Sequence, residues 1–95
     1  MFMVSLKFSD GKSRAAELMD GHKAWIKQGF DDGVFLMTGS LVPGLGGAVL
    51  AHNTSREALE DRVNADPFVA EDVVRAEIVE IEASQTDARL DFLCA

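Results

Sequence analysis

The spacing of apolar residues changes along the chain, and the first changes predict a strand followed by a long helix. Residues 2–8 (FMVSLKF) place apolar side chains on alternate positions, which predicts a β-strand. From about residue 12 to residue 30 the apolar positions recur at helical spacing, which predicts a helix that ends near Gly33. Gly21 and Gly29 are expected to weaken this helix, each by about 1 kcal/mol relative to Ala. One broad face of the helix carries Ala15, Leu18, Met19, His22, Trp25, Ile26 and Phe30.

The remaining patterns predict three more strands and a second helix. An apolar run, a glycine-rich turn and a second apolar run predict a hairpin, and the polar cluster from Asn53 to Ser55 offers caps for the helix after it. Pro67 is expected to interrupt the chain after that helix. The predicted elements are a strand over 34–42, a turn over 43–47, a strand over 47–52, a helix over 56–66, a strand over 73–83 and an apolar tail over 84–95 that docks on the body.

The order β-α-β-β-α-β predicts an α+β fold of the ferredoxin-like kind, an antiparallel four-stranded sheet with both helices on one face. The strands carry apolar residues on both sides, so the other face of the sheet is expected to need cover. A second copy of the chain is the simplest cover, and a symmetric homodimer is therefore predicted. The 95 residues are expected to form one domain.

Composition narrows the function classes. A net charge of −7 and scattered basic residues argue against nucleic acid and against an anionic membrane as partners. The apolar stretch at the start is too short for the core of a signal peptide and has no basic leader, so none is expected. No apolar run approaches the length of a membrane span. Cys94 is the single cysteine, so we expect a reduced cytoplasmic protein. The spacing of His and Cys supports no metal site.

His22 is the first candidate for chemistry, because it lies in the middle of an apolar helical stripe. A polar, titratable side chain in that position needs a partner or a function. It is either a histidine at the edge of the core that stabilises the helix, or a catalytic residue. Spacing alone favours the structural interpretation.

Asp66, Trp25 and Ser40 each have two interpretations. Asp66 directly precedes Pro67 and is either a second candidate for chemistry or a turn or cap residue, and the sequence favours the turn or cap. Trp25 is either a core residue or a surface on which a substrate stacks. Ser40 is either a pocket hydroxyl or a polar strand residue.

Four stretches in order resemble the YCII-related (YciI-like) family of the dimeric α/β-barrel superfamily. They are the first strand MFMVSLKF, HKAWI on the first helix, the hairpin TGSLVP…GG, and ADPF after the second helix. The resemblance covers about residues 1–83, and the upstream H-x-x-W together with ADPF is its most specific part. Many relatives have Gly-Pro where this chain has Gly39-Ser40, so no substrate can be transferred from them.

The resemblance implies a ferredoxin-like protomer that dimerises through its sheet, with a His–Asp pair at His22 and Asp66 as the active site. In that family one relative is a dehydrochlorinase that acts on a chlorinated hydroxyhydroquinone, and the superfamily includes muconolactone isomerases and small monooxygenases. We therefore expect either a small cofactor-free lyase or isomerase that acts on an aromatic or lactone substrate, or a non-catalytic dimer that binds a small ligand or a partner. Trp25, Leu18 and Met37 are expected to form the apolar wall of the pocket, and Ser40 to contribute a hydroxyl.

Overall fold

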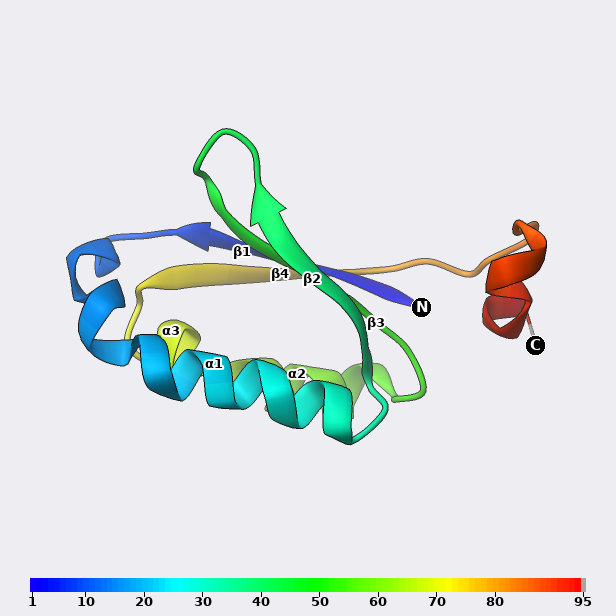
Figure 1. The fold of residues 1–95 in the computed structure, drawn as a ribbon, viewed down its shortest axis with the longest axis horizontal. Coiled ribbons are helices and arrows are strands. Elements are labelled where there is room, and N and C mark those ends of the chain that lie inside the picture. Colours follow the sequence, from blue (N-terminus) through cyan, green and yellow to red (C-terminus); the bar gives the residue numbers. More distant parts are fainter. Residues whose placement is uncertain (95) are drawn as a thin grey trace.

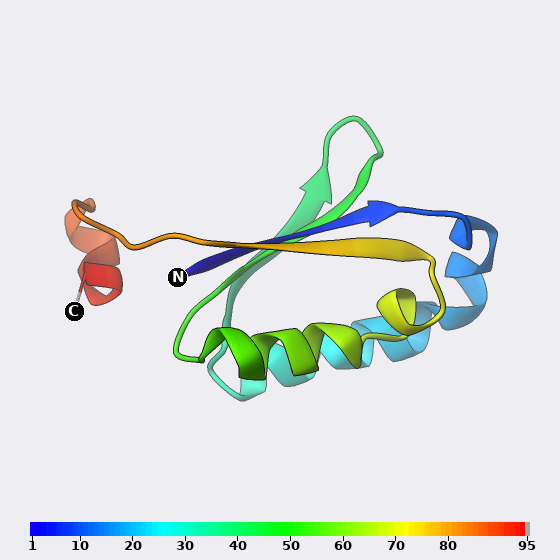
Figure 2. The ribbon, with the colours of Figure 1, turned by 180° about the vertical axis from the view of Figure 1, so that it is seen from behind.

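The computed structural model describes residues 1–94 and contains one antiparallel sheet with two long helices on a single face (Figure 1, Figure 2). The strands lie in the order β2-β3-β1-β4, so the first and third strands are central. This is the predicted ferredoxin-like arrangement, which is confirmed. The elements are β1 (Phe2–Phe8), η1 (Lys12–Arg14), α1 (Ala15–Asp31), β2 (Phe35–Leu41), β3 (Gly46–Ala51), α2 (Arg56–Asn64), α3 (Pro67–Ala70), β4 (Val74–Glu80) and η2 (Ala88–Cys94).

The core lies between the sheet and the helices, and the alternation of the central strand directs it there. Phe2, Val4 and Leu6 of β1 are buried, whereas Met3 and Lys7, on the opposite face of the strand, are exposed. Alternate side chains of a strand point to opposite faces, so one face of β1 fills the core and the other does not. The other buried apolar residues are Val34, Phe35, Val49, Ala51, Leu59, Val63, Phe68, Val73 and Val74.

Gly29 is required by packing, which the sequence did not reveal. It is the one fully buried residue of α1, and a Cβ atom built on it would overlap the ring of Phe35 on β2. The same ring meets Trp25 edge-on at a centroid distance of 5.0 Å and Phe30 at 6.0 Å. The prediction that Gly29 only weakens the helix is therefore incomplete, because the missing side chain lets α1 approach β2 closely.

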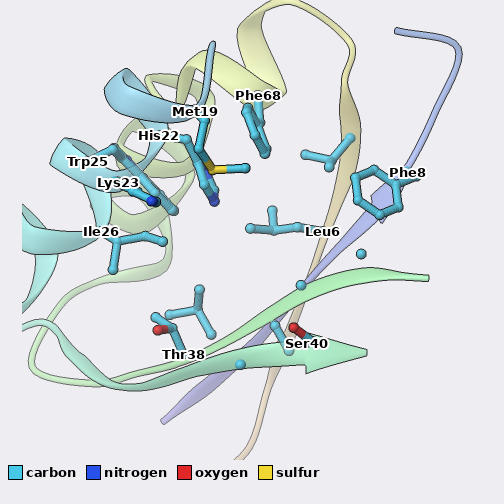
Figure 3. A pocket seen from close by; sticks show the side chains of 16 residues that line it. Leu6, Phe8, Met19, His22, Lys23, Trp25, Ile26, Thr38, Ser40 and Phe68 are labelled. Carbon is cyan, nitrogen blue, oxygen red and sulfur yellow. The ribbon is translucent and has the colours of Figure 1, made fainter. Parts of the chain in front are cut away.

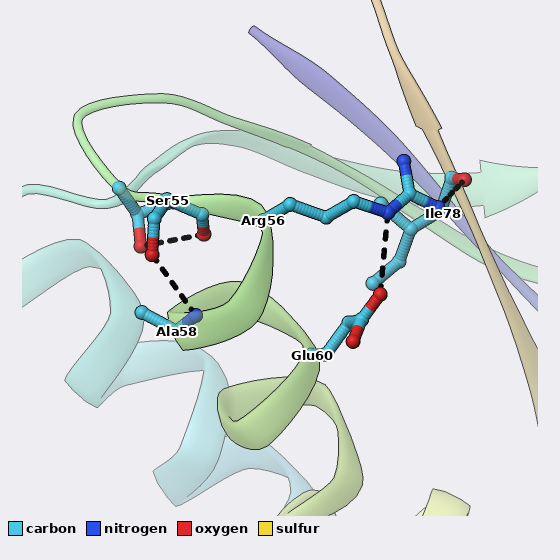
Figure 4. Close-up of polar contacts among 6 residues, drawn as sticks. Ser55, Arg56, Ala58, Glu60 and Ile78 are labelled. Atoms are coloured by element: carbon cyan, nitrogen blue, oxygen red, sulfur yellow. Dashed lines mark hydrogen bonds and ion pairs between the residues drawn. The ribbon is translucent and has the colours of Figure 1, made fainter.

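Helix α2 begins at the cap that the polar cluster predicted. Ser55 is extended, and its hydroxyl accepts a hydrogen bond from the backbone N–H of Ala58 at 3.1 Å (Figure 4). Arg56 follows, and its guanidinium donates to Glu60 and to the backbone carbonyl of Ile78 at 3.1 Å. Ile78 belongs to the edge strand β4, so Arg56 both ties α2 to the sheet and satisfies a carbonyl at this part of the edge.

The segment predicted as an interruption at Pro67 contains the short helix α3. Pro67 occupies its first turn, where the missing N–H is not needed, and Asp66 caps it. A helix of four residues has no apolar periodicity, so the spacing of side chains did not predict it. The helix predicted over 56–66 ends earlier, at Asn64, because the chain turns there into α3.

The open face of the sheet is apolar along a single row that crosses all four strands. Met3 pairs with Leu50 on one side and Val79 on the other, and Leu50 pairs with Met37. Met3, Met37 and Val79 remain 46–50% exposed. Further along the same face Ser5 lies beside Glu77 and Lys7 beside Arg75, so the expectation of apolar residues on both faces holds for one end of the sheet only.

The C-terminal segment leads away from the sheet to η2, at the end of the molecule where the N-terminus lies (Figure 1). Phe92 contacts His52 at a centroid distance of 5.5 Å, but Leu90 and Phe92 stay exposed. The tail lies against this end of the body, where Phe92 and Leu93 line a hollow together with Met1, His52 and Asn53. Ala95, the last residue of the predicted tail, lies outside the described residues. No helix within residues 1–94 has the length and apolarity needed to cross a bilayer.

Candidate active site

His22 lies between two aromatic rings on the inner face of α1. Its imidazole is parallel to the ring of Phe68 on α3, with 3.9 Å between centroids and 3° between planes. The Trp25 ring lies 5.8 Å away at 22°. The side chain of His22 is 14% exposed. Two aromatic neighbours thus restrict the imidazole to one plane.

Asp66 holds this imidazole by one of its nitrogens. The Oδ1 atom of Asp66 lies 2.8 Å from Nδ1 of His22, and it also accepts the backbone N–H of Phe68 at 3.0 Å. Because Oδ1 already acts as an acceptor for Phe68, we assign the proton of the first contact to Nδ1 of His22. A single oxygen of Asp66 therefore both caps α3 and pairs with His22.

Local geometry explains why Asp66 reaches His22. A residue that precedes proline is driven to extended backbone, and Asp66 has φ −61° and ψ 125°. The chain then turns at once into α3, which brings Phe68 back over the imidazole. Asp66 itself is fully buried, so its carboxylate is screened from water.

The second nitrogen of His22 faces an open cleft of about 330 Å³ between α1 and the sheet (Figure 3). Within residues 1–94 no protein group hydrogen-bonds to Nε2. With the proton on Nδ1, Nε2 carries a free lone pair directed at this space. The cleft is lined mainly by apolar side chains, with the hydroxyls of Thr38 and Ser40 on the opposite wall, on β2.

Trp25 lines the cleft and also connects α1 to α2. Its indole N–H donates to the backbone carbonyl of Arg62 on α2 at 2.8 Å, which ties the two helices together. The guanidinium of Arg62 in turn donates to Asp32 at 3.0 Å. That hydrogen bond, with a second one from Gln28, holds the pKa of Asp32 below its usual range.

The strand parity decides which predicted wall residues reach the cleft. Ser40 does so, because it pairs with Gly47 on the face that meets the helices. Met37 does not, and that prediction is wrong: a register shift between Phe35 and Met37 places it beside Leu50 on the open face. Leu18 packs against the core and does not line the cleft, so that prediction is also wrong. Met19 and Ile26 of the same helix line the cleft.

Comparison with known families assigns the chain. The family model for the YCII-related domain matches residues 1–82. The chain belongs to the YCII-related family. A search of curated proteins found no match. The suspected resemblance is thereby confirmed for most of the chain.

Three residues of this YCII-related domain line the cleft although the sequence did not single them out for it. Phe68, Lys23 and Thr38 stood only within the stretches that carry the family resemblance and were given no place at the site. Lys23 directly follows His22, but a lysine on an amphipathic helix is usually a solvated residue, so spacing carried no signal. Thr38 could have been found from the parity of Ser40, two residues later on the same strand.

The YCII-related domain shows no cluster of three or more His, Cys, Asp or Glu side chains arranged for a metal ion in the part of the chain that the structure describes. The groups that meet at the cleft are one imidazole, one ammonium and two hydroxyls. This set can move a proton and bind polar atoms of a small ligand.

Proposed function

We propose that the protein is a small cofactor-free enzyme in which His22 is a general base and Asp66 orients it. The observation that carries this proposal is the 2.8 Å contact between Nδ1 of His22 and Oδ1 of Asp66, with Nε2 left free at an apolar cleft. A carboxylate that accepts from Nδ1 selects the tautomer whose Nε2 can take a proton, and it stabilises the imidazolium that forms.

The cleft suits a small aromatic or lactone substrate and lyase or isomerase chemistry. Nε2 takes a proton from a phenol or from carbon α to a carbonyl, and the electron pair of that bond moves into the substrate. In an isomerase the imidazolium returns the proton to a different atom of the substrate. In a lyase the electron pair expels a leaving group with its bonding electrons. Both routes balance without an added oxidant or reductant.

A compound screen tests this proposal directly. Small phenols, aromatic ketones and lactones are first ranked by the shift in melting temperature that they cause, and those that bind are then followed by NMR for conversion. We expect at least one compound to be converted, since the cleft has room for a ring and a base at its side. Compounds that bind beside His22 and are never converted would favour the second candidate, a non-catalytic ligand-binding dimer.

We further propose that the protein is a homodimer whose interface is the open face of the sheet. The support is the row of Met37, Leu50, Met3 and Val79, which a single chain leaves largely exposed. The single cysteine suits a reduced compartment such as the cytoplasm, and we treat residues 1–95 as one domain.

The dimer has a simple test in dilute solution. Light scattering should give a mass about twice the 10.3 kDa of one chain, and Met3→Glu should lower that mass because it places a charge in the middle of the row. Val42→Glu is the matched control, since Val42 is exposed at the hairpin turn, away from the row. A mass near that of one chain, with no loss of stability on dilution, would contradict the dimer.

A further inference from the structure

The ionisable side chains that line the cleft are both basic. Lys23 and His22 are the two, and none of the sixteen acidic residues of the chain lies on its wall. The carboxylate of Asp66 is buried beside His22, and its Oδ1 is already bound by two N–H groups. A ligand in the cleft therefore meets basic groups in a protein whose net charge is −7.

Lys23 has no carboxylate partner among the described residues, unlike its neighbour on the same helix. Lys27 pairs with Asp31 at 2.7 Å and does not line the cleft. A second ammonium lies close by: Nζ of Lys12 is 4.7 Å from the centroid of the Phe8 ring, and Phe8 is part of the cleft wall. Lys12 itself does not line the cleft, so Lys23 is the one lysine of its wall, and a cation there favours an anionic ligand.

The side chains that line the cleft favour a planar ring compound. Trp25, Phe68 and Leu6 present flat or apolar surfaces, and His22 is itself fixed parallel to the ring of Phe68. Apolar walls with a few polar groups are typical of sites for small ring compounds.

We propose that the ligand is a small planar acid whose anionic oxygen pairs with Lys23 while its ring lies along the apolar wall. This inference rests on the proposed function, since it names the substrate class of the same site. Lys23 then acts as a binding residue, and it also acts during proton transfer. When Nε2 of His22 takes a proton, negative charge develops on the substrate, and an ammonium beside it stabilises that charge.

The overall negative charge opposes this binding but does not decide it. Screening limits surface charges to a range of about 10 Å at 0.1 M salt, so a ligand in the cleft responds mainly to the groups around it. The ammonium of Lys23 is also free to meet the ligand, because it is not held by an acid within residues 1–94.

Trp25 provides the readout, since it is the only tryptophan of the chain and it lines the cleft. Quenching of its fluorescence by iodide is compared with quenching by neutral acrylamide. Binding of benzoate is then compared with that of benzamide, which has the same ring without the charge. Each measurement is made on the wild type, on Lys23→Met, and on Lys27→Met, which removes the same charge from the same helix outside the cleft.

We expect benzoate to bind the wild type about two- to fivefold more tightly than benzamide, since an ion pair with the exposed side chain of Lys23 supplies a difference of that size. Lys23→Met should remove most of the preference and lower the ratio of iodide to acrylamide quenching. Lys27→Met should leave both unchanged. Equal affinity for the acid and the amide in the wild type, no response to either compound, or equal effects of the two lysine variants would overturn the inference.

The outcome is separable from that of the proposed function. Turnover that depends on His22 but is unchanged in Lys23→Met, with no acid preference, would overturn the inference and leave the general base intact. An acid preference that depends on Lys23, in a protein that converts no compound, would support the inference and contradict the proposed catalysis.

Discussion

Replacing His22 with asparagine is expected to lower turnover about 100- to 10,000-fold, the usual contribution of a positioned general base. Asp66→Ala should lower it about tenfold or more, because the imidazole keeps its place between Phe68 and Trp25 but loses the partner that sets its tautomer. The double variant should be little worse than the His22 variant alone. Residues that act as one unit are strongly non-additive, so rates measured on the four proteins test the pairing itself.

Measuring the free energy of unfolding shows whether Asp66→Ala lowers turnover by removing the partner of His22 or by unfolding the protein. Asp66→Ala removes the hydrogen bond from Phe68 that caps α3 and the hydrogen bond with His22, which together should lower the free energy of unfolding by about 2 kcal/mol. Asp66→Asn is the control for stability, because its amide oxygen can still accept the hydrogen bond from the backbone N–H of Phe68. An Asp66→Ala protein that is folded and as active as the wild type would contradict the role of Asp66.

Gly29→Ala is expected to destabilise the protein by about 1–3 kcal/mol, the usual cost of overpacking, even though alanine is the better helix former. The new methyl group would enter the ring of Phe35, which Trp25 and Phe30 keep in place. Urea unfolding measures the change.

Gly21→Ala is the matched control on the same helix. A Cβ atom there would lie 3.1 Å from Cγ of Pro67, a contact that a small shift relieves, so the gain in helix propensity should roughly offset it. The account of Gly29 fails if Gly29→Ala is as stable as the wild type. Combining it with Phe35→Leu, which frees space at that point, should recover part of the loss.

The fold could be predicted from the sequence because its long elements have clear periods. The alternation over 2–8 corresponds to β1, and the helical stripe through His22 and Trp25 persists over several turns and corresponds to α1. The period fails where elements are short or irregular. Four residues of α3 show no repeat, and the register shift before Met37 reverses which face that side chain occupies.

The candidate site was predictable only in part, for the same physical reasons. The stripe placed His22 at the core edge, but periodicity holds no information about a partner 44 residues away, and Asp66 was paired with it by resemblance to a family. The close approach at Gly29 depends on a contact between α1 and β2, which the sequence does not reveal. The sequence therefore predicted only that Gly29 weakens the helix. Lys23 was missed because its neighbours across the cleft are known only from the folded chain.

The most direct test of the central claim is the tautomer of His22, which requires no substrate. Long-range ¹H–¹⁵N NMR separates the two histidines and reports which ring nitrogen carries the proton, with His52 as the internal reference. We predict that His22 has its proton on Nδ1 with Nε2 unprotonated, and that Asp66→Ala removes this preference while His52 is unchanged. A His22 that carries its proton on Nε2 in the wild type, or a tautomer that does not respond to Asp66→Ala, would contradict the claim that Asp66 prepares His22 as a base.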